Sequence, residues 1–237
     1  MSSATRNCSE LVPNWMPRPR PARAPLAGRW CTLEPLDPDR HAAQLHAAFA
    51  QDARGSGWTY LPYGPFADAD SYADWMRVNA LGIDPQFFAV MEIGSGRAIG
   101  IVAFLRIEPA HGTIEIGHIH WSPILQRTPA ATEAIFLLLD LVFALGYRRC
   151  EWKCDAANMP SRGAAARFGF RFEGEFLQHM IVKGHNRDTT WFAILDREWP
   201  ALRAAYESWL RVENFDERGR QRGRLAEAVS AASSRES

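Results

Sequence analysis

The spacing of hydrophobic positions changes several times along the chain, and each change predicts a switch between helix and strand. Apolar residues recur at helical spacing in four stretches of the central region, 37–50, 68–80, 130–145 and 158–168. Strands are predicted in the runs rich in β-branched and aromatic residues, 29–36, 87–92, 98–107, 113–121, 148–154, 170–175, 176–182 and 189–195. Most neighbouring strands are joined by short turns, so this order predicts an α+β fold with a mixed, mostly antiparallel sheet flanked by helices.

One strand–helix–strand unit, residues 113–154, differs from the hairpins around it. Its helix has Thr128 as N-cap and Pro129 in the first turn, and Gly146 follows its last turn. Such a helix returns the chain to the end of the sheet from which it came, so the two strands that it joins run parallel with a right-handed crossover. The sequence therefore predicts one parallel crossover in the sheet.

We expect one domain over residues 29–212 with a polar segment at each end. Residues 1–28 contain five prolines and four arginines, which favour extended, flexible backbone, although an arginine-rich arm for a partner is the alternative. A helical pattern covers residues 199–210. Residues 213–237 are predicted to be a fraying helix followed by a polar tail.

The composition excludes several classes of protein. Lysine and arginine number 27, and aspartate and glutamate also number 27, so overall charge does not support nucleic-acid binding. The longest apolar stretch, 135–147, is interrupted by Asp140 and is too short to cross a bilayer, and no secretory signal is visible. The cysteines form no CxxC pair and are expected to be free thiols; they are Cys8, Cys31, Cys150 and Cys154. We expect a cytoplasmic monomer or homodimer that binds no membrane.

The loop between strand 113–121 and helix 130–145 has the chemistry of an anion site. Unpaired N–H groups at a helix N-terminus attract anions, and the helix dipole adds to this attraction. Small residues, Ala130, Ala131 and Thr132, leave these amides accessible, and Gln126 and Arg127 add side-chain donors. This junction predicts a phosphate or pyrophosphate site.

The same segment resembles the acyl-CoA-binding motif of the GNAT superfamily of N-acetyltransferases, which begins its long helix with Gln/Arg-x-x-Gly-x-Gly/Ala. The matching residues are Gln126, Arg127, Thr128, Pro129, Ala130 and Ala131. Residues 132–134, 115–117 and 122–123 resemble the branch that acetylates ribosomal-protein N-termini. Asn158 and Ser161, followed by Gly169-Phe170, look like the second motif of the superfamily. The resemblance covers residues 30–197.

The resemblance implies an acyl-CoA-dependent N-acyltransferase that uses acetyl-CoA, without a metal, to modify a primary amine by direct attack. The amine would belong to a protein N-terminus or to a small molecule. Pyrophosphate would rest on the amides of Arg127, Thr128, Ala130, Ala131 and Thr132. Pantetheine would pair with the backbone of Ile119, His120 and Trp121, where an N–H would stabilise the oxyanion, and would meet Asn158 and Ser161.

Two residues depart from the family pattern. Pro129 replaces the central glycine of the motif and has no N–H, so one phosphate donor is lost. Ala165 occupies the position at which many members carry a tyrosine that protonates the thiolate. These departures leave open an alternative function, a CoA-binding or CoA-sensing domain that does not turn over.

Glu115 is the predicted general base, taking the amine proton through a water, and a structural ion pair is the alternative role. His120 and His118 compete for the role because imidazole titrates near neutral pH. Strict strand alternation places both histidines on the face opposite Glu115, together with Ile114, where they would be core residues. A metal held by the two histidines is not expected, because no third ligand lies at a useful spacing.

The acceptor site is predicted from aromatic residues. Trp58, Tyr60 and Tyr63 fall in the loop 55–66, where the superfamily gathers acceptor-binding residues, and they form an apolar wall there or cap the core. Trp152 on strand 148–154 is a further candidate, with core packing as its alternative role.

Overall fold

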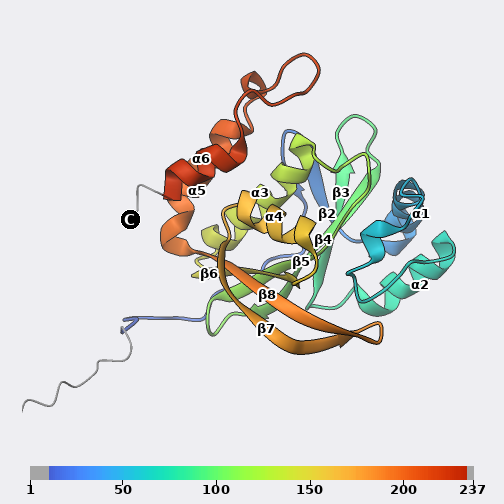
Figure 1. Ribbon diagram of the computed structural model, residues 1–237, viewed down its shortest axis with the longest axis horizontal. Coiled ribbons are helices and arrows are strands. Elements are labelled where there is room, and N and C mark those ends of the chain that lie inside the picture. Colours follow the sequence, from blue (N-terminus) through green and yellow to red (C-terminus); the bar gives the residue numbers. More distant parts are fainter. Residues whose placement is uncertain (1–10, 234–237) are drawn as a thin grey trace, which may run out of the picture.

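The structure, a computed structural model, describes residues 11–233; Cys8 and the rest of residues 1–10 and 234–237 lie outside this range. Eight strands form one sheet in the order β1-β2-β3-β4-β5-β6-β8-β7 (Figure 1). The strands are β1 (Leu26–Ala27), β2 (Cys31–Pro35), β3 (Gln86–Glu92), β4 (Ala98–Glu108), β5 (Thr113–Trp121), β6 (Arg149–Asp155), β7 (Arg171–Val182) and β8 (His185–Leu195). The α-helices are α1 (Pro38–Phe49), α2 (Ala69–Asn79), α3 (Pro129–Ala144), α4 (Met159–Arg167), α5 (Trp199–Trp209) and α6 (Leu225–Ser233). Three short 3-10 helices are η1 (Ser56–Trp58), η2 (Asp196–Glu198) and η3 (Val212–Asn214).

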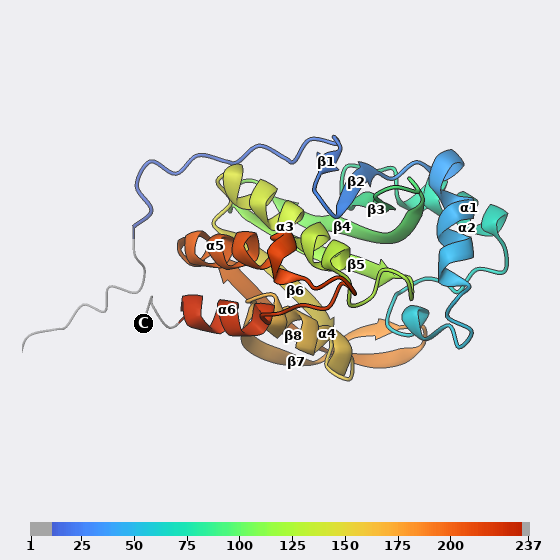
Figure 2. The same ribbon diagram turned by 90° about the horizontal axis from the view of Figure 1, so that it is seen from above.

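Two hydrophobic cores cover the two faces of the sheet. The larger core lies under α3, α4, α5 and α6 and contains Leu138 with Ile114 of β5. The smaller core lies under α1 and α2 and contains Phe49, Tyr72 and Phe87. Figures 1 and 2 show the four later helices gathered together and the α1–α2 pair at the opposite end of the sheet. The α+β fold with a mixed, mostly antiparallel sheet is confirmed.

Local sequence explains where the helices begin. The side chain of Asp37 accepts hydrogen bonds from the amides of residues 39 and 40, and Asp68 forms a capping box with Ser71. Thr128 and Asn158 cap α3 and α4 in the same way, each with a proline in the first turn. No described helix is both long enough and apolar enough to cross a membrane.

The predicted parallel pair is present but short. Between β5 and β6, pairing runs from Thr113 opposite Arg149 to Glu115 opposite Glu151. The last six residues of β5 then have no partner on β6, while β6 continues its pairing with β8 on its other side. The sheet therefore opens in its middle, at the ends of the strands that precede α3 and α4.

A β-bulge corrects the predicted faces of β5. His118 has a positive φ of 50°, and the register with β4 shifts between Ile101 and Ala103. The bulge interrupts the alternation, so the histidine rings fall on the α1–α2 face: His118 packs beside Phe87 and His120 beside Phe49. The expectation that they lie opposite Glu115 is wrong, because Ile114 and Ile116 on either side of Glu115 pack in the larger core, which leaves Glu115 on the α1–α2 face.

Two further sequence expectations differ from the structure. The runs 170–175 and 176–182 are one edge strand, β7, which continues across the expected break between residues 175 and 176 and has a bulge at Gln178. Residues 225–233, expected within a polar tail, form α6, which buries Leu225 and Val229 in the larger core. The mixed-charge segment 216–224 concealed the amphipathic pattern that follows it.

The N-terminal segment is extended, as its prolines require, but the part from Trp15 onward is fixed to the domain. The Trp15 indole donates to the carbonyl of Ala110 over 2.7 Å. Arg23 donates to the carbonyls of Leu81 and Gly82, and residues 26–27 pair with β2 as β1. The description of this stretch as a free tail therefore does not hold for residues 15–28.

Candidate active site

The N-terminus of α3 lies beside the opening between β5 and β6. Arg127 adopts a left-handed backbone, φ 62°, which turns the chain from the loop into Thr128 and the helix. The amide of Ala131 is taken by the Thr128 hydroxyl at 3.2 Å, and the amide of Thr128 donates to Leu125. Among the described residues, the amides of Arg127 and Ala130 have no hydrogen-bond partner. These two N–H groups are the donors that remain for an anion.

The side chains of the loop divide into structural and exposed ones. Gln126 donates its amide to the Trp121 carbonyl at 3.0 Å and so ties the loop to the end of β5. The Arg127 side chain is exposed. Pro129 occupies the first position of α3, as its fixed φ favours, and supplies no donor. Thr132 is buried, and its hydroxyl accepts a hydrogen bond from Arg167 at 3.0 Å.

Glu133, one turn into α3, is a residue whose role the sequence did not reveal. Its buried carboxylate accepts from the backbone amides of Arg29, Trp30 and Cys31 at 2.6–2.9 Å. Burial and this neighbouring carboxylate raise the pKa of the Cys31 thiol, which therefore stays protonated. Glu133 thus fixes the helix N-terminus against β2, and its signal in the sequence was a carboxylate near the start of a largely apolar helix.

The second motif holds α4 in place. The Asn158 side chain accepts from the Ser161 amide at 3.1 Å, and the Ser161 hydroxyl accepts from the Trp152 indole at 3.0 Å. Trp152 packs against Phe168 and Phe170 in the larger core. Its ring therefore lies on the α4 side of the sheet, away from Trp58 and the α1–α2 face, which agrees with its alternative role in core packing.

Glu115 stands where the parallel pairing ends. Its Oε2 accepts a hydrogen bond of 2.8 Å from the Arg106 guanidinium and forms an ion pair with Lys153, whose Nζ lies 3.0 Å away. The same Nζ forms a second ion pair with Glu151, at 2.7 Å. Its Oε1 lies beside Gly117, which has no side chain; a Cβ atom at Gly117 would be 3.5 Å from this oxygen. Burial raises the pKa of Glu115, and the charges of Lys153 and Arg106 oppose this rise. The carboxylate thus has one oxygen held by cations and one oxygen directed along β5 toward the opening.

The two histidines lie among aromatic rings, His120 buried and His118 half-buried. His120 stacks on Phe49 with ring centroids 3.8 Å apart and meets the edge of Trp58. Burial lowers the pKa of His120 to about 4, and burial with nearby arginines lowers the pKa of His118 to about 4. Both rings are therefore neutral at pH 7, and each Nδ1 lacks a partner among the described residues.

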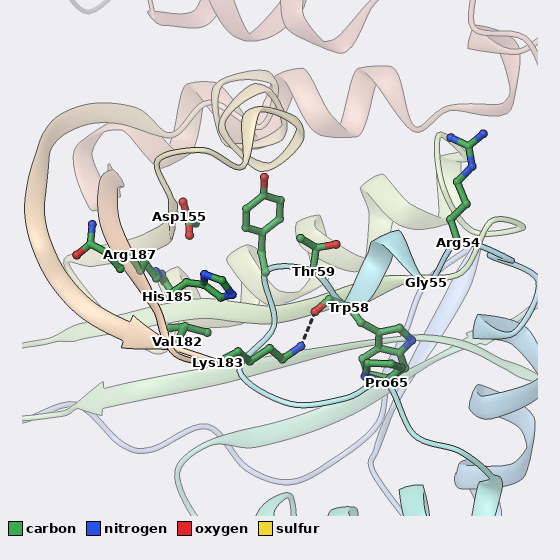
Figure 3. Close-up of a pocket in the computed structure, with 12 residues that line it drawn as sticks. Arg54, Gly55, Trp58, Thr59, Pro65, Asp155, Val182, Lys183, His185 and Arg187 are labelled. Carbon is green, nitrogen blue, oxygen red and sulfur yellow. Dashed lines mark hydrogen bonds between the residues drawn. The ribbon is translucent and has the colours of Figure 1, made fainter.

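A cavity of about 500 Å³ opens on the α1–α2 face, between the α1–α2 loop and the tip of the β7–β8 hairpin (Figure 3). Its lining residues are Arg54, Gly55, Trp58, Thr59, Tyr60, Pro65, Asp155, Val182, Lys183, His185, Asn186 and Arg187. The hairpin turn consists of Lys183 and Gly184, both with positive φ, as a two-residue hairpin turn requires. Trp58 links the cavity to His120 of β5, and Asp155 ends β6, so the cavity borders the opening in the sheet.

Two hydrogen bonds close the rim of this cavity. The Tyr60 hydroxyl donates to the carbonyl of Ala157 at 3.1 Å, and the Lys183 ammonium donates to the carbonyl of Trp58 at 2.9 Å. Of the predicted acceptor residues, Trp58 and Tyr60 line the cavity. Tyr63 is instead packed between Trp75 and His118. The charged residues of the hairpin gave no sequence signal, because only the fold brings residues 183–187 to residues 54–60.

Within residues 11–233, no group of three or more His, Cys, Asp or Glu side chains is arranged to hold a metal ion. The described cysteines, Cys31, Cys150 and Cys154, are free and buried. The groups that remain for chemistry are the open edge of β5, the amides at the start of α3, Glu115 and the cavity.

Comparison with known proteins places this arrangement in a family. The model of the acetyltransferase (GNAT) domain family matches residues 31–171. The chain is 31% identical to the uncharacterised N-acetyltransferase YnaD of Bacillus subtilis (strain 168) over 142 residues, 59% of this chain and 81% of that protein.

Solved structures agree with this match. A GCN5-related N-acetyltransferase from Brucella melitensis is 50% identical, with a TM-score of 0.90 over 92% of this chain and 100% of that one. A probable GNAT-family acetyltransferase from Chromobacterium violaceum is 44% identical, with a TM-score of 0.77 over 84% of this chain and 100% of that one. The chain therefore belongs to the GNAT acetyltransferase family.

Proposed function

We propose that the protein transfers an acetyl group from acetyl-CoA to a primary amine by direct attack on the thioester. The observation that carries this proposal is the opening between β5 and β6 beside the free amides at the start of α3. An extended ligand can pair with the unpaired edge of β5 there, while its phosphates meet the helix N-terminus. The family uses acetyl-CoA as cosubstrate, and the residues present fit that molecule.

The backbone holds the cosubstrate in this proposal. Arg127 and Ala130 donate their amides to the pyrophosphate, and the small side chains of residues 130–132 let it approach. Ile119, His120 and Trp121 offer their main-chain groups to the pantetheine arm. One of these N–H groups polarises the thioester carbonyl and stabilises the oxyanion, an effect worth about 3 kcal/mol per donor.

Glu115 accepts the proton in this proposal. The amine nitrogen forms a bond to the carbonyl carbon, the carbon–sulfur bond breaks, and the amine proton passes through a water to Oε1 of Glu115. Arg106 and Lys153 hold the other oxygen, Oε2, so the carboxylate keeps its direction along β5. The buried ring of His120 is the less basic group, because its pKa is about 4.

The CoA thiolate leaves without a tyrosine beside it. Ala165, at the position where many family members carry the acid, is fully buried in the larger core, so no group at this position reaches the thiolate. A non-catalytic CoA-binding domain is the alternative function that this absence favours. Turnover with an amine panel, measured as release of free thiol from acetyl-CoA, distinguishes the two functions.

Substitution of Ala130 by Glu tests the phosphate site. A carboxylate placed there repels the pyrophosphate. Such an uncompensated charge contact costs about 1–3 kcal/mol, so we expect CoA affinity to fall roughly tenfold to hundredfold. Isothermal titration calorimetry with CoA measures the change. Ala204→Glu on the exposed side of α5 is the matched control and should leave the affinity unchanged. Equal affinities of Ala130→Glu and the parent protein would overturn the assignment of this loop.

The acceptor is a protein N-terminus or a small amine in this proposal, and the resemblance to the ribosomal-protein branch favours the former. The segments that carry that resemblance now have structural roles: Glu133 anchors β2 and Glu115 belongs to an ion network. They act on the cosubstrate side and on the base, and neither lines the acceptor cavity. The cavity itself supplies the argument about the acceptor.

A further inference from the structure

The acceptor cavity is unusually rich in cations. Arg54 of the α1–α2 loop lies at one edge of the cavity, and Lys183, His185 and Arg187 belong to the hairpin on its other side (Figure 3). Asp155 is the one carboxylate among the twelve lining residues. Without counting His185, the lining carries three positive charges and one negative charge.

These cations have no carboxylate partner, in contrast to most arginines around them. Within residues 11–233, none of the three forms an ion pair, whereas Arg106, Arg149 and Arg162 all do. Arg187 donates its Nε to the Thr189 hydroxyl at 3.2 Å, and its remaining N–H donors are free for a ligand. Like charges gathered at one cavity repel one another, and an anion bound among them removes this repulsion.

The phosphates of CoA do not account for these charges. The helix N-terminus that would hold them belongs to α3, which packs on the larger core. The cavity adjoins Trp58, which packs with α1 and α2 on the other core. The two sites therefore approach the opening from opposite faces of the sheet, and the cations serve the second substrate.

We propose that the acceptor is a primary amine, of a free amino acid or of the first residue of a peptide, that also carries a carboxylate, bound in this cavity by Arg54 and Arg187. This inference rests on the proposed function. A volume of about 500 Å³ suits a small molecule or the first residues of a peptide. Trp58, Tyr60, Pro65 and Val182 contact its apolar part. Asp155, at the end of β6, meets the ammonium end, and a guanidinium binds the carboxylate with paired hydrogen bonds.

Two sources can supply this chemistry, a free amino acid or a peptide with an acidic first residue. Matched acceptors separate them: apolar amino acids against their amides, and amidated peptides beginning with Asp or Glu against those beginning with Asn or Gln. Spermidine represents amines without an anion. We expect kcat/KM for the anionic member of one pair to exceed that of its neutral partner at least tenfold, and the favoured pair identifies the source.

Variants locate the binding groups. Arg187→Ala and Arg54→Ala should raise the KM of the anionic acceptor at least tenfold while changing that of the neutral partner little. Arg97→Ala, at the exposed turn between β3 and β4, is the matched control and should change neither. CoA affinity, measured by calorimetry, should be the same in all of these variants. Weakened CoA binding in Arg187→Ala would assign the cations to the cosubstrate and overturn the inference.

Calorimetric titration of each acceptor into the CoA complex separates the two proposals. Binding of anionic acceptors without thiol release would overturn the proposed function and keep the assignment of the cavity. Turnover that is equal for acids and amides, or highest with spermidine, would keep the proposed function and overturn the assignment. Absence of both binding and turnover for all anionic acceptors would overturn the inference as well.

Discussion

The two faces of the sheet contribute to the site by different means. On the α3 face, the contacts come from the backbone: two free amides, a left-handed Arg127 and the open edge of β5. On the α1–α2 face, they come from side chains: an aromatic wall, Glu115 and three cations that have no carboxylate partner within residues 11–233. A site built from backbone groups keeps its ligand through many substitutions as long as the turn keeps its shape. The specificity of a site built from side chains changes when a single residue is replaced. One face therefore suits a constant cosubstrate and the other a variable acceptor.

The largest expected effect lies at the junction of the two faces. Glu115→Gln removes the proposed proton acceptor but keeps hydrogen bonds to Arg106 and Lys153, so kcat should fall at least hundredfold, because general bases contribute about 10²–10⁴-fold. Since burial raises the pKa of Glu115, the parent rate should fall as pH drops through that raised value, because the carboxyl then carries the proton. The variant should lose this acidic limb.

Glu151→Gln is the control for that experiment. It disturbs the same Lys153, which lies 2.7 Å from Glu151, but its side chain is not the one directed toward Gly117. We expect a small change in kcat and an unchanged acidic limb. An identical loss in both variants would make Glu115 a structural member of the ion network and would remove it from the reaction.

The next effect concerns the stability of the α1–α2 face in acid. A histidine has an ordinary pKa near 6.5, and burial lowers that of His120 to about 4. Above pH 6.5 neither state binds the proton; between pH 6.5 and 4 the unfolded chain binds it and the folded chain does not, so stability falls as pH falls. One ring accounts for roughly 3 kcal/mol of this loss.

His120→Asn should therefore lower the free energy of unfolding at pH 7, because the stack on Phe49 is lost, and should flatten its decline between pH 6.5 and 4. Urea denaturation at a series of pH values measures both quantities. His111→Asn, at an exposed turn, should keep the parent slope. A parent-like slope in the His120 variant would show that His120 does not contribute to acid unfolding.

The difference between the faces also explains what the sequence could predict. Three signals are local in the sequence: the helix caps at Thr128 and Asn158, the small residues after them, and the change of hydrophobic spacing from strand to helix. Residues near one another therefore sufficed to predict α3, its loop and the single crossover. The bulge at His118 has no such local signal, and it moved two rings to the other face. The cavity joins residues 54–60 with 182–187, a contact that exists only after the sheet has formed.

The C-terminus illustrates the same limit. Leu225 and Val229 are one helical turn apart, which is a helical signal, but the preceding charged segment dominates the composition of the region. Burial on α5 and α4, which the sequence cannot show, is what makes α6 part of the domain. Similarly, Glu115 could be identified as a candidate, but its two cations come from β4 and β6 and were visible only in the structure.

The smallest expected effect tests the rim of the acceptor cavity. Tyr60→Phe removes the hydrogen bond to the carbonyl of Ala157, which joins the α1–α2 loop to the loop before α4. A hydrogen bond of this kind contributes about 1 kcal/mol, so the free energy of unfolding should fall by about that amount. Acceptor KM should rise a few-fold as the rim loosens, while CoA affinity stays constant because the backbone face is untouched.

Tyr63→Phe is the matched change within the same loop. The Tyr63 hydroxyl is buried without a hydrogen-bond partner among the described residues, so its removal should leave stability unchanged or raise it slightly. Chemical denaturation of the two variants beside the parent compares them directly. If Tyr60→Phe proves as stable as Tyr63→Phe and keeps the parent KM, the hydroxyl bridge does not hold the rim. The aromatic wall alone would then shape the acceptor side, as Trp58 packs on both Phe49 and His120 without it.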